Sequence, residues 1–119
     1  MTREEMRKRT KAYANRIVNL CISLPENWVA RTLGKQLLRC GTSVGANYRA
    51  VCRAKSNSDF INKLRIVEEE CDESLFWMEL LVDNKLVKAS RLRDLMNEAD
   101  ELMAIVVSSV KTARTSGSA

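Results

Sequence analysis

Basic side chains recur at helical spacing from residue 31 to residue 53. If this segment is helical, the cations project within an arc of about 80° and span about 33 Å of the helix axis. They are Arg31, Lys35, Arg39, Arg49 and Arg53. Such a stripe could contact successive phosphates of a nucleic-acid backbone, so these residues are the candidate nucleic-acid contacts.

Two other interpretations of the stripe stay open. The cations could form an ordinary solvated helix face, or they could pair with acidic residues of a neighbouring helix or subunit. No aromatic side chain lies among them to stack on bases, which argues against a sequence-specific reader of single strands.

The chain contains no histidine, and this excludes several kinds of catalytic site. No Ser-His or Cys-His dyad and no imidazole metal site can form. Carboxylates gather between residues 68 and 79, but a di-metal bundle site would pair them with an E-x-x-H histidine. They are Glu68, Glu69, Glu70, Asp72, Glu73 and Glu79. We therefore expect no catalytic residue, no metal, no cofactor and no enzymatic activity.

Four cysteines are present, without a CxxC pair, and three of them lie on or beside apolar helix faces. They are Cys21, Cys40, Cys52 and Cys71. We favour reduced cysteines that act as small hydrophobic residues over a disulfide or a zinc site.

Apolar residues at 3–4 spacing predict four amphipathic helices, over about residues 6–24, 27–51, 58–82 and 90–110. Pro25 ends the first helix, and Ser58 and Ser90 are the expected N-caps of the third and fourth. Short links favour an antiparallel up-and-down four-helix bundle, so the fold class is all-α. We expect one domain, residues 1–111, followed by a disordered C-terminal tail, residues 112–119.

The predicted core faces follow from the same spacing. They comprise Met6, Thr10, Tyr13, Ile17, Leu20 and Leu24; Leu33, Leu37, Cys40, Val44, Tyr48 and Val51; Phe60, Leu64, Val67, Cys71, Leu75, Met78 and Val82; and Leu92, Met96, Ala99, Met103, Val106 and Val110.

Three glycines, Gly34, Gly41 and Gly45, align with Cys52 on a strip of the second helix between its core and basic faces. Glycine in a helix interior costs nearly 1 kcal/mol relative to alanine. We therefore expect another helix to approach closely along this strip. None of the glycines belongs to a phosphate-binding GxGxxG or P-loop pattern.

The third helix carries a second apolar stripe away from its core face, formed by Ile66, Phe76, Trp77 and Leu80. Large exposed apolar groups on a small protein usually mark an interface, so we expect self-association through this stripe. Alternatively, the bundle or the N-terminal arm covers it.

Charge is sorted along the chain. Residues 1–24 and 25–55 carry net charges of +4 and +5, residues 56–87 carry −5, and residues 88–119 carry +1. A basic side and an acidic, apolar side suit a head-to-tail interface between copies, which closes into a ring when the rotation allows.

The N-terminal residues MTREEMRKRTK are charged, unlike a secretory signal. The longest aliphatic run, residues 104–107, is too short to span a membrane. We therefore expect a cytoplasmic protein without membrane contacts.

The central part of the chain resembles a known family. The segments SVGANYRA (43–50), SDFINKL (58–64) and EEECDESLFWME (68–79) are similar to the four-helix-bundle proteins encoded within intervening sequences of bacterial 23S ribosomal RNA genes. The resemblance extends over residues 36–81, whereas the first and fourth helices agree in pattern alone.

The resemblance implies a homopentameric ring. It also extends to the accessory protein of diversity-generating retroelements, which binds nucleic acid and a reverse transcriptase through positive charge. Our leading hypothesis is therefore a non-catalytic, ring-forming bundle that binds RNA, DNA or an RNA–protein complex through the basic stripe. The rival hypothesis is a structural or protein-interaction module whose stripe is used in contacts between subunits.

Overall fold

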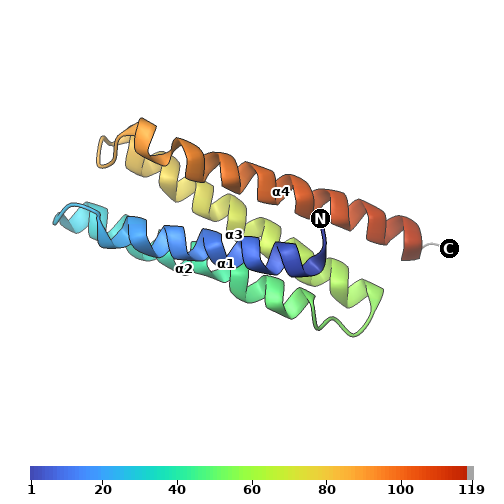
Figure 1. Cartoon of the computed structure of the whole chain (residues 1–119). Coiled ribbons are helices and arrows are strands. Elements are labelled where there is room, and N and C mark those ends of the chain that lie inside the picture. Colours follow the sequence, from blue (N-terminus) through green and yellow to red (C-terminus); the bar gives the residue numbers. More distant parts are fainter. Residues whose placement is uncertain (118–119) are drawn as a thin grey trace.

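The computed structural model of the protein describes residues 1–117 and is built of four helices (Figure 1). They are α1 (Arg3–Ile22), α2 (Trp28–Val51), α3 (Asn57–Asp83) and α4 (Ala89–Gly117). The molecule measures 53 × 21 × 20 Å, so its length is set by the helices themselves. The all-α four-helix class predicted from the sequence is confirmed.

Side-chain caps fix where three of the helices begin. Thr2, Asn27 and Ser56 accept hydrogen bonds from backbone N–H groups in the first turns of α1, α2 and α3. The expected cap Ser58 is wrong, because Ser56 Oγ accepts from the Asp59 amide at 3.0 Å and Ser58 lies inside α3. Ser90 likewise lies inside α4, which begins at Ala89.

Short links make successive helices antiparallel, as the up-and-down arrangement requires (Figure 1). Helix α2 packs between α1 and α3, and α3 packs between α2 and α4. Helix α1 meets α4 in the least extensive of the four contacts, and α2 does not touch α4. The two basic helices, α1 and α2, are therefore neighbours on one side of the bundle.

The buried core contains most of the predicted residues, but in α3 and α4 the buried face is turned by one position. Ser74 and Leu81 are buried where Leu75 and Val82 were expected, and the latter two are half-buried. In α4, Leu95 and Leu102 are buried, and the expected Met96 and Met103 are half-buried. Leu24, Leu33 and Phe60 also lie at the edge of the core.

The C-terminal part of α4 differs from the sequence-based expectation. Residues 112–117, expected to begin a disordered tail, form the last turns of the helix. Ala113 is buried, and its carbonyl oxygen accepts a hydrogen bond from Asn57 Nδ2 at 2.9 Å. This tertiary contact holds a polar segment that has little hydrophobic surface of its own. Residues 118–119 lie outside the described part.

None of the described helices is both long enough and apolar enough to cross a membrane.

Candidate nucleic-acid interface

The five cations predicted to contact nucleic acid all lie exposed on the outer side of α2 or just after its end. Four of them make no side-chain hydrogen bond or ion pair with the residues that the structure describes: Arg31, Lys35, Arg49 and Arg53. Within the described part of the chain, nothing neutralises these four charges.

The fifth cation, Arg39, is engaged by acidic residues of α3. Its Nη2 donates to Glu73 Oε1 at 2.5 Å, and its Nη1 lies 3.6 Å from Glu70 Oε2. Burial raises the pKa of Glu70, and the positive charge of Arg39 opposes that rise. The stripe is therefore partly neutralised at its middle by acidic residues of α3 in the same chain.

An aromatic residue lies on this side of α2, contrary to the sequence-based expectation. Trp28 begins the helix and is 72% exposed. It precedes Lys35 by seven residues, which is about two helical turns, so the two project in nearly the same direction. That spacing is visible in the sequence and could have revealed Trp28 as a stacking surface beside the cations.

The glycine strip of α2 lies against α1, and the predicted close approach is confirmed. A Cβ atom on Gly41 would lie 2.8 Å from both γ carbons of Ile17. A Cβ on Gly45 would lie 3.2 Å from the Thr10 carbonyl oxygen and 3.6 Å from the Lys11 amide nitrogen. Only glycine permits this spacing without moving α1.

The same contact brings a further cation to the interface. Lys11 lies beside Gly45 of α2, is exposed, and has no side-chain partner within residues 1–117. Arg49 lies one helical turn beyond Gly45. The backbone of Lys11 therefore lies beside α2, and we group its exposed side chain with the cations of α2 as the α1–α2 basic face: Lys11, Arg31, Lys35, Arg49 and Arg53. The sequence alone could not show which helix lies beside the glycines.

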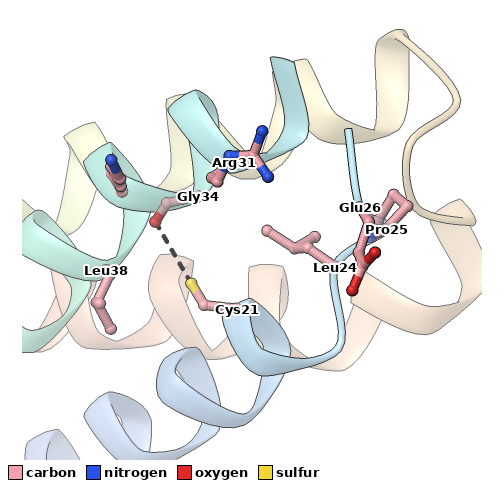
Figure 2. Close-up of a pocket in the computed structure, with 8 residues that line it drawn as sticks. Cys21, Leu24, Pro25, Glu26, Arg31, Gly34 and Leu38 are labelled. Atoms are coloured by element: carbon pink, nitrogen blue, oxygen red, sulfur yellow. Dashed lines mark hydrogen bonds between the residues drawn. The ribbon is translucent and has the colours of Figure 1, made fainter. Parts of the chain in front are cut away.

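A pocket of about 300 Å³ opens at the end of this face, where α1 stops and the chain turns into α2 (Figure 2). Its walls are mainly apolar, and two cations of the basic face line it. The residues are Cys21, Leu24, Pro25, Glu26, Arg31, Gly34, Lys35 and Leu38. The Cys21 thiol donates to the Gly34 carbonyl oxygen at 3.5 Å, which leaves neither group without a partner.

The predicted interface stripe of α3 is partly exposed. Ile66 and Phe76 are 42% and 50% exposed, and Trp77 and Leu80 are half-buried. The rings of Phe76 and Trp77 meet edge to face with centroids 5.1 Å apart. Trp77 Nε1 donates to Glu73 Oε1 at 3.4 Å. Thus Phe76 and Ile66 present apolar surface beside acidic groups.

The cysteines are free, and two of them are poorly suited to chemistry. Burial raises the pKa of Cys40 and Cys71 to about 12, so both stay protonated at neutral pH. Within residues 1–117, no group of three or more cysteine and carboxylate side chains is arranged to hold a metal ion.

Comparison with known proteins places this architecture among relatives. The model of the 23S rRNA-intervening sequence protein family matches residues 3–108. A solved structure, a protein of unknown function from the S23 ribosomal protein family of Bacteroides thetaiotaomicron, is 34% identical and superposes with a TM-score of 0.87. The match covers 93% of this chain and 99% of that one. No curated protein shows significant similarity to the chain.

Proposed function

Because the chain belongs to the 23S rRNA-intervening sequence protein family, we propose that it is a non-catalytic homo-oligomeric bundle that binds RNA through the α1–α2 basic face. One observation carries the proposal: Arg31, Lys35, Arg49 and Arg53 are exposed and have no partner within the described residues. Exposed cations that make no ion pair suit the phosphates of a nucleic-acid backbone.

The spacing of these cations supports the proposal. Arg31 and Lys35 are four residues apart, and so are Arg49 and Arg53. Like charges at this spacing destabilise a helix by about 0.2–0.5 kcal/mol per pair. A polyanionic ligand would relieve the repulsion, whereas an unliganded, purely structural helix would be more stable with acids interspersed.

Oligomerisation forms the second part of the proposal. Phe76 and Ile66 expose apolar area on α3, and the same helix carries the surplus of acidic residues. We propose that this face contacts another copy and that the assembly closes into a ring, which the sequence resemblance implies is a pentamer. Native mass spectrometry tests this: Phe76→Lys should lower the mass of the particle, while Val107→Lys, at a comparably exposed site on α4, should leave it unchanged. A monomeric wild-type particle at high concentration contradicts it.

A salt titration tests RNA binding. The affinity of the wild-type protein for a structured RNA should fall linearly, on logarithmic scales, with salt concentration. Replacing the four unpaired cations of α2 by glutamine should reduce the slope by about 3, because each phosphate contact contributes about 0.7–0.9.

A matched control separates local contacts from net charge. The variant in which Lys88, Arg93, Lys111 and Arg114 become glutamine loses the same charge at exposed sites on or beside α4, which does not touch α2. Its affinity and slope should stay near those of the wild type. Equal losses in both variants, or no RNA binding at low salt, would contradict the proposal.

A second candidate function is a protein-interaction module whose basic stripe is used between subunits. The pairing of Arg39 with Glu73 and Glu70 favours it, because it shows that acidic α3 side chains can neutralise this stripe. Lysine acetylation footprinting of the assembled particle distinguishes the two. Protection of Lys35 in the RNA-free assembly supports the interaction module, and reactivity of Lys35 that is lost on adding RNA supports RNA binding.

A further inference from the structure

The pocket at the α1–α2 turn combines two kinds of surface that a nucleotide requires. Leu24 and Leu38 supply apolar walls, and Arg31 brings positive charge to the same opening (Figure 2). Lys35 also lines the pocket and adds a second positive charge. Its volume of about 300 Å³ is at the lower end of the range for small-molecule sites, which suits one ring system rather than two.

Two polar groups in the pocket wall, a thiol and a backbone carbonyl, already form a hydrogen bond with each other. The Cys21 thiol and the Gly34 carbonyl oxygen bond to each other at 3.5 Å, so an apolar ring can cover both without leaving a polar group unpaired. Arg31 and Lys35 have no partner within residues 1–117 and are therefore free to bind an anion. The thiol and the carbonyl of the pocket wall are thus already hydrogen-bonded, whereas the two cations have no anionic partner among the described residues.

Glu26 is the acidic side chain that lines the pocket, and it lies away from the wall formed by Leu38. In Figure 2, Pro25 and Glu26 lie on the side opposite Leu38. A carboxylate there would repel a phosphate close by but would accept a hydrogen bond from the amino group of a base, as acidic side chains do with cytosine.

We infer that this pocket binds one unstacked nucleotide of the RNA, with its phosphate at Arg31 and Lys35 and its base against Leu24 and Leu38. The inference rests on the proposed RNA binding and specifies it further. The protein reads an RNA in which a base is unpaired, for example a bulge, and the basic face holds the flanking backbone. Proteins commonly recognise RNA at such splayed bases rather than inside regular helices.

Methyl NMR on the whole protein tests the pocket directly, with cytidine 5′-monophosphate as the probe. The methyl signals of Leu24 and Leu38 should shift and saturate, and inorganic phosphate alone should leave them in place. Leu38→Glu should abolish the shift of Leu24. Val107→Glu is the matched control, because Val107 is 36% exposed and Leu38 is 39% exposed. In this control the methyl signals of Leu24 should still shift. Equal shifts with phosphate, or none with the nucleotide, overturn the inference.

A second experiment, with two RNA hairpins, tests the pocket together with the basic face. The wild-type protein should bind a hairpin with one bulged cytidine at least about fivefold more tightly than the fully paired hairpin, the low end of what contact with one base is worth. Leu38→Gln, which adds no charge beside Arg31 and Lys35, should lose this preference and still bind the paired hairpin with the wild-type salt slope. If both hairpins bind equally to the wild type, only the pocket inference fails. If neither binds at low salt, the proposed function fails and the nucleotide titration still decides on the pocket. A Leu38→Gln variant whose native mass changes while its bulge preference persists would show instead that the pocket receives another copy of the chain.

Discussion

Substituting Gly41 by alanine tests whether the close α1–α2 contact limits the stability of the bundle. The new Cβ would lie 2.8 Å from Cγ1 and from Cγ2 of Ile17, and 3.2 Å from its Cβ. Carbon atoms in contact prefer about 3.5–4.0 Å. Rotation about χ1 of Ile17 would not relieve the overlap, because both γ carbons take part and a β-branched side chain is stiff in a helix.

Two opposing effects set the size of the change. Alanine is more favourable than glycine in a helix interior by about 0.8–1.0 kcal/mol. Overpacking a buried site costs about 1–3 kcal/mol, and the upper half of this range applies because Ile17 is fully buried. We expect Gly41→Ala to lose about 1–2 kcal/mol in the free energy of unfolding, which lowers the Tm by about 3–8 °C in a chain of this length.

Gly34→Ala provides the matched control on the same strip. Its Cβ would lie 2.7 Å from Leu24 Cδ1, the tip of a flexible and half-buried side chain that can move aside. Here the helix-propensity gain should dominate, so the variant should be unchanged or more stable by up to about 1 kcal/mol. Urea unfolding followed by far-UV circular dichroism measures both, at one protein concentration, because oligomerisation couples to stability.

A double-mutant cycle locates the effect at Ile17. Ile17→Ala alone should cost about 2–5 kcal/mol. It also removes both γ carbons from the overlap and leaves only the Cβ contact at 3.2 Å, so Gly41→Ala should destabilise that background less than it destabilises the wild type. If Gly41→Ala equals the wild type in stability, or changes it as Gly34→Ala does, the close-packing argument is wrong.

Two further predictions concern polar contacts between helices. Arg9→Met should cost about 1–3 kcal/mol, because it leaves the half-buried Glu98 carboxylate without the two 2.7 Å hydrogen bonds from Arg9. Those bonds lower the pKa of Glu98, so the advantage of the wild type should be complete above pH 4.5, the ordinary pKa, and vanish as the pH falls through the lower pKa of the folded state. Ser74→Ala should cost more than Tyr13→Phe, by up to about 2 kcal/mol, because it leaves the buried Tyr13 hydroxyl without its 2.6 Å partner. In Tyr13→Phe, by contrast, Ser74 Oγ keeps its bond to the Cys71 carbonyl oxygen at 2.7 Å.

Urea unfolding over a series of pH values checks the first of these, with Arg7→Met as the control on an exposed pair within α1. A constant difference between the wild type and Arg9→Met down to pH 3 would show that Glu98 does not respond to Arg9. Equal losses in Ser74→Ala and Tyr13→Phe would show that the phenol hydroxyl finds another partner.

The sequence predicted the fold well where one helix face is apolar and the other is not. In α1, five of the six expected core residues are buried, because no second stripe competes with them. Helix α3 is apolar on two sides, so periodicity alone could not decide between overlapping faces. Ser74 is buried there because its hydroxyl bonds to Tyr13 and Cys71, a tertiary arrangement that hydrophobicity does not report.

The start of α3 shows a different limit. Ser56, Asn57 and Ser58 are all residue types that cap helices, so composition could not select among them. The spacing Ser56-x-x-Asp59 resembles a capping box. In the structure, Ser56 Oγ accepts a hydrogen bond from the Asp59 amide, and Asp59 Oδ2 accepts one from the Lys55 amide, both at 3.0 Å. The Ser56–Asp59 spacing therefore predicts the start of α3 correctly, with Ser56 as the N-cap.

The close contact between α1 and α2 produces both the basic face and the pocket. Gly41 and Gly45 bring the two backbones together, and this places the backbone of Lys11 beside α2. Toward Gly34 the contact ends, because α1 stops at Ile22 and Pro25 prevents its continuation, while α2 begins only at Trp28. The space left at that end is the pocket, and it lies beside Arg31 and Lys35 because both occur in the first two turns of α2. Gly41→Ala, which should push α1 and α2 apart, should therefore move Lys11 away from Arg49. It should weaken RNA binding as well as lower stability. Gly34→Ala should leave the affinity for a fully paired hairpin unchanged and reduce only the response of Leu24 to cytidine 5′-monophosphate.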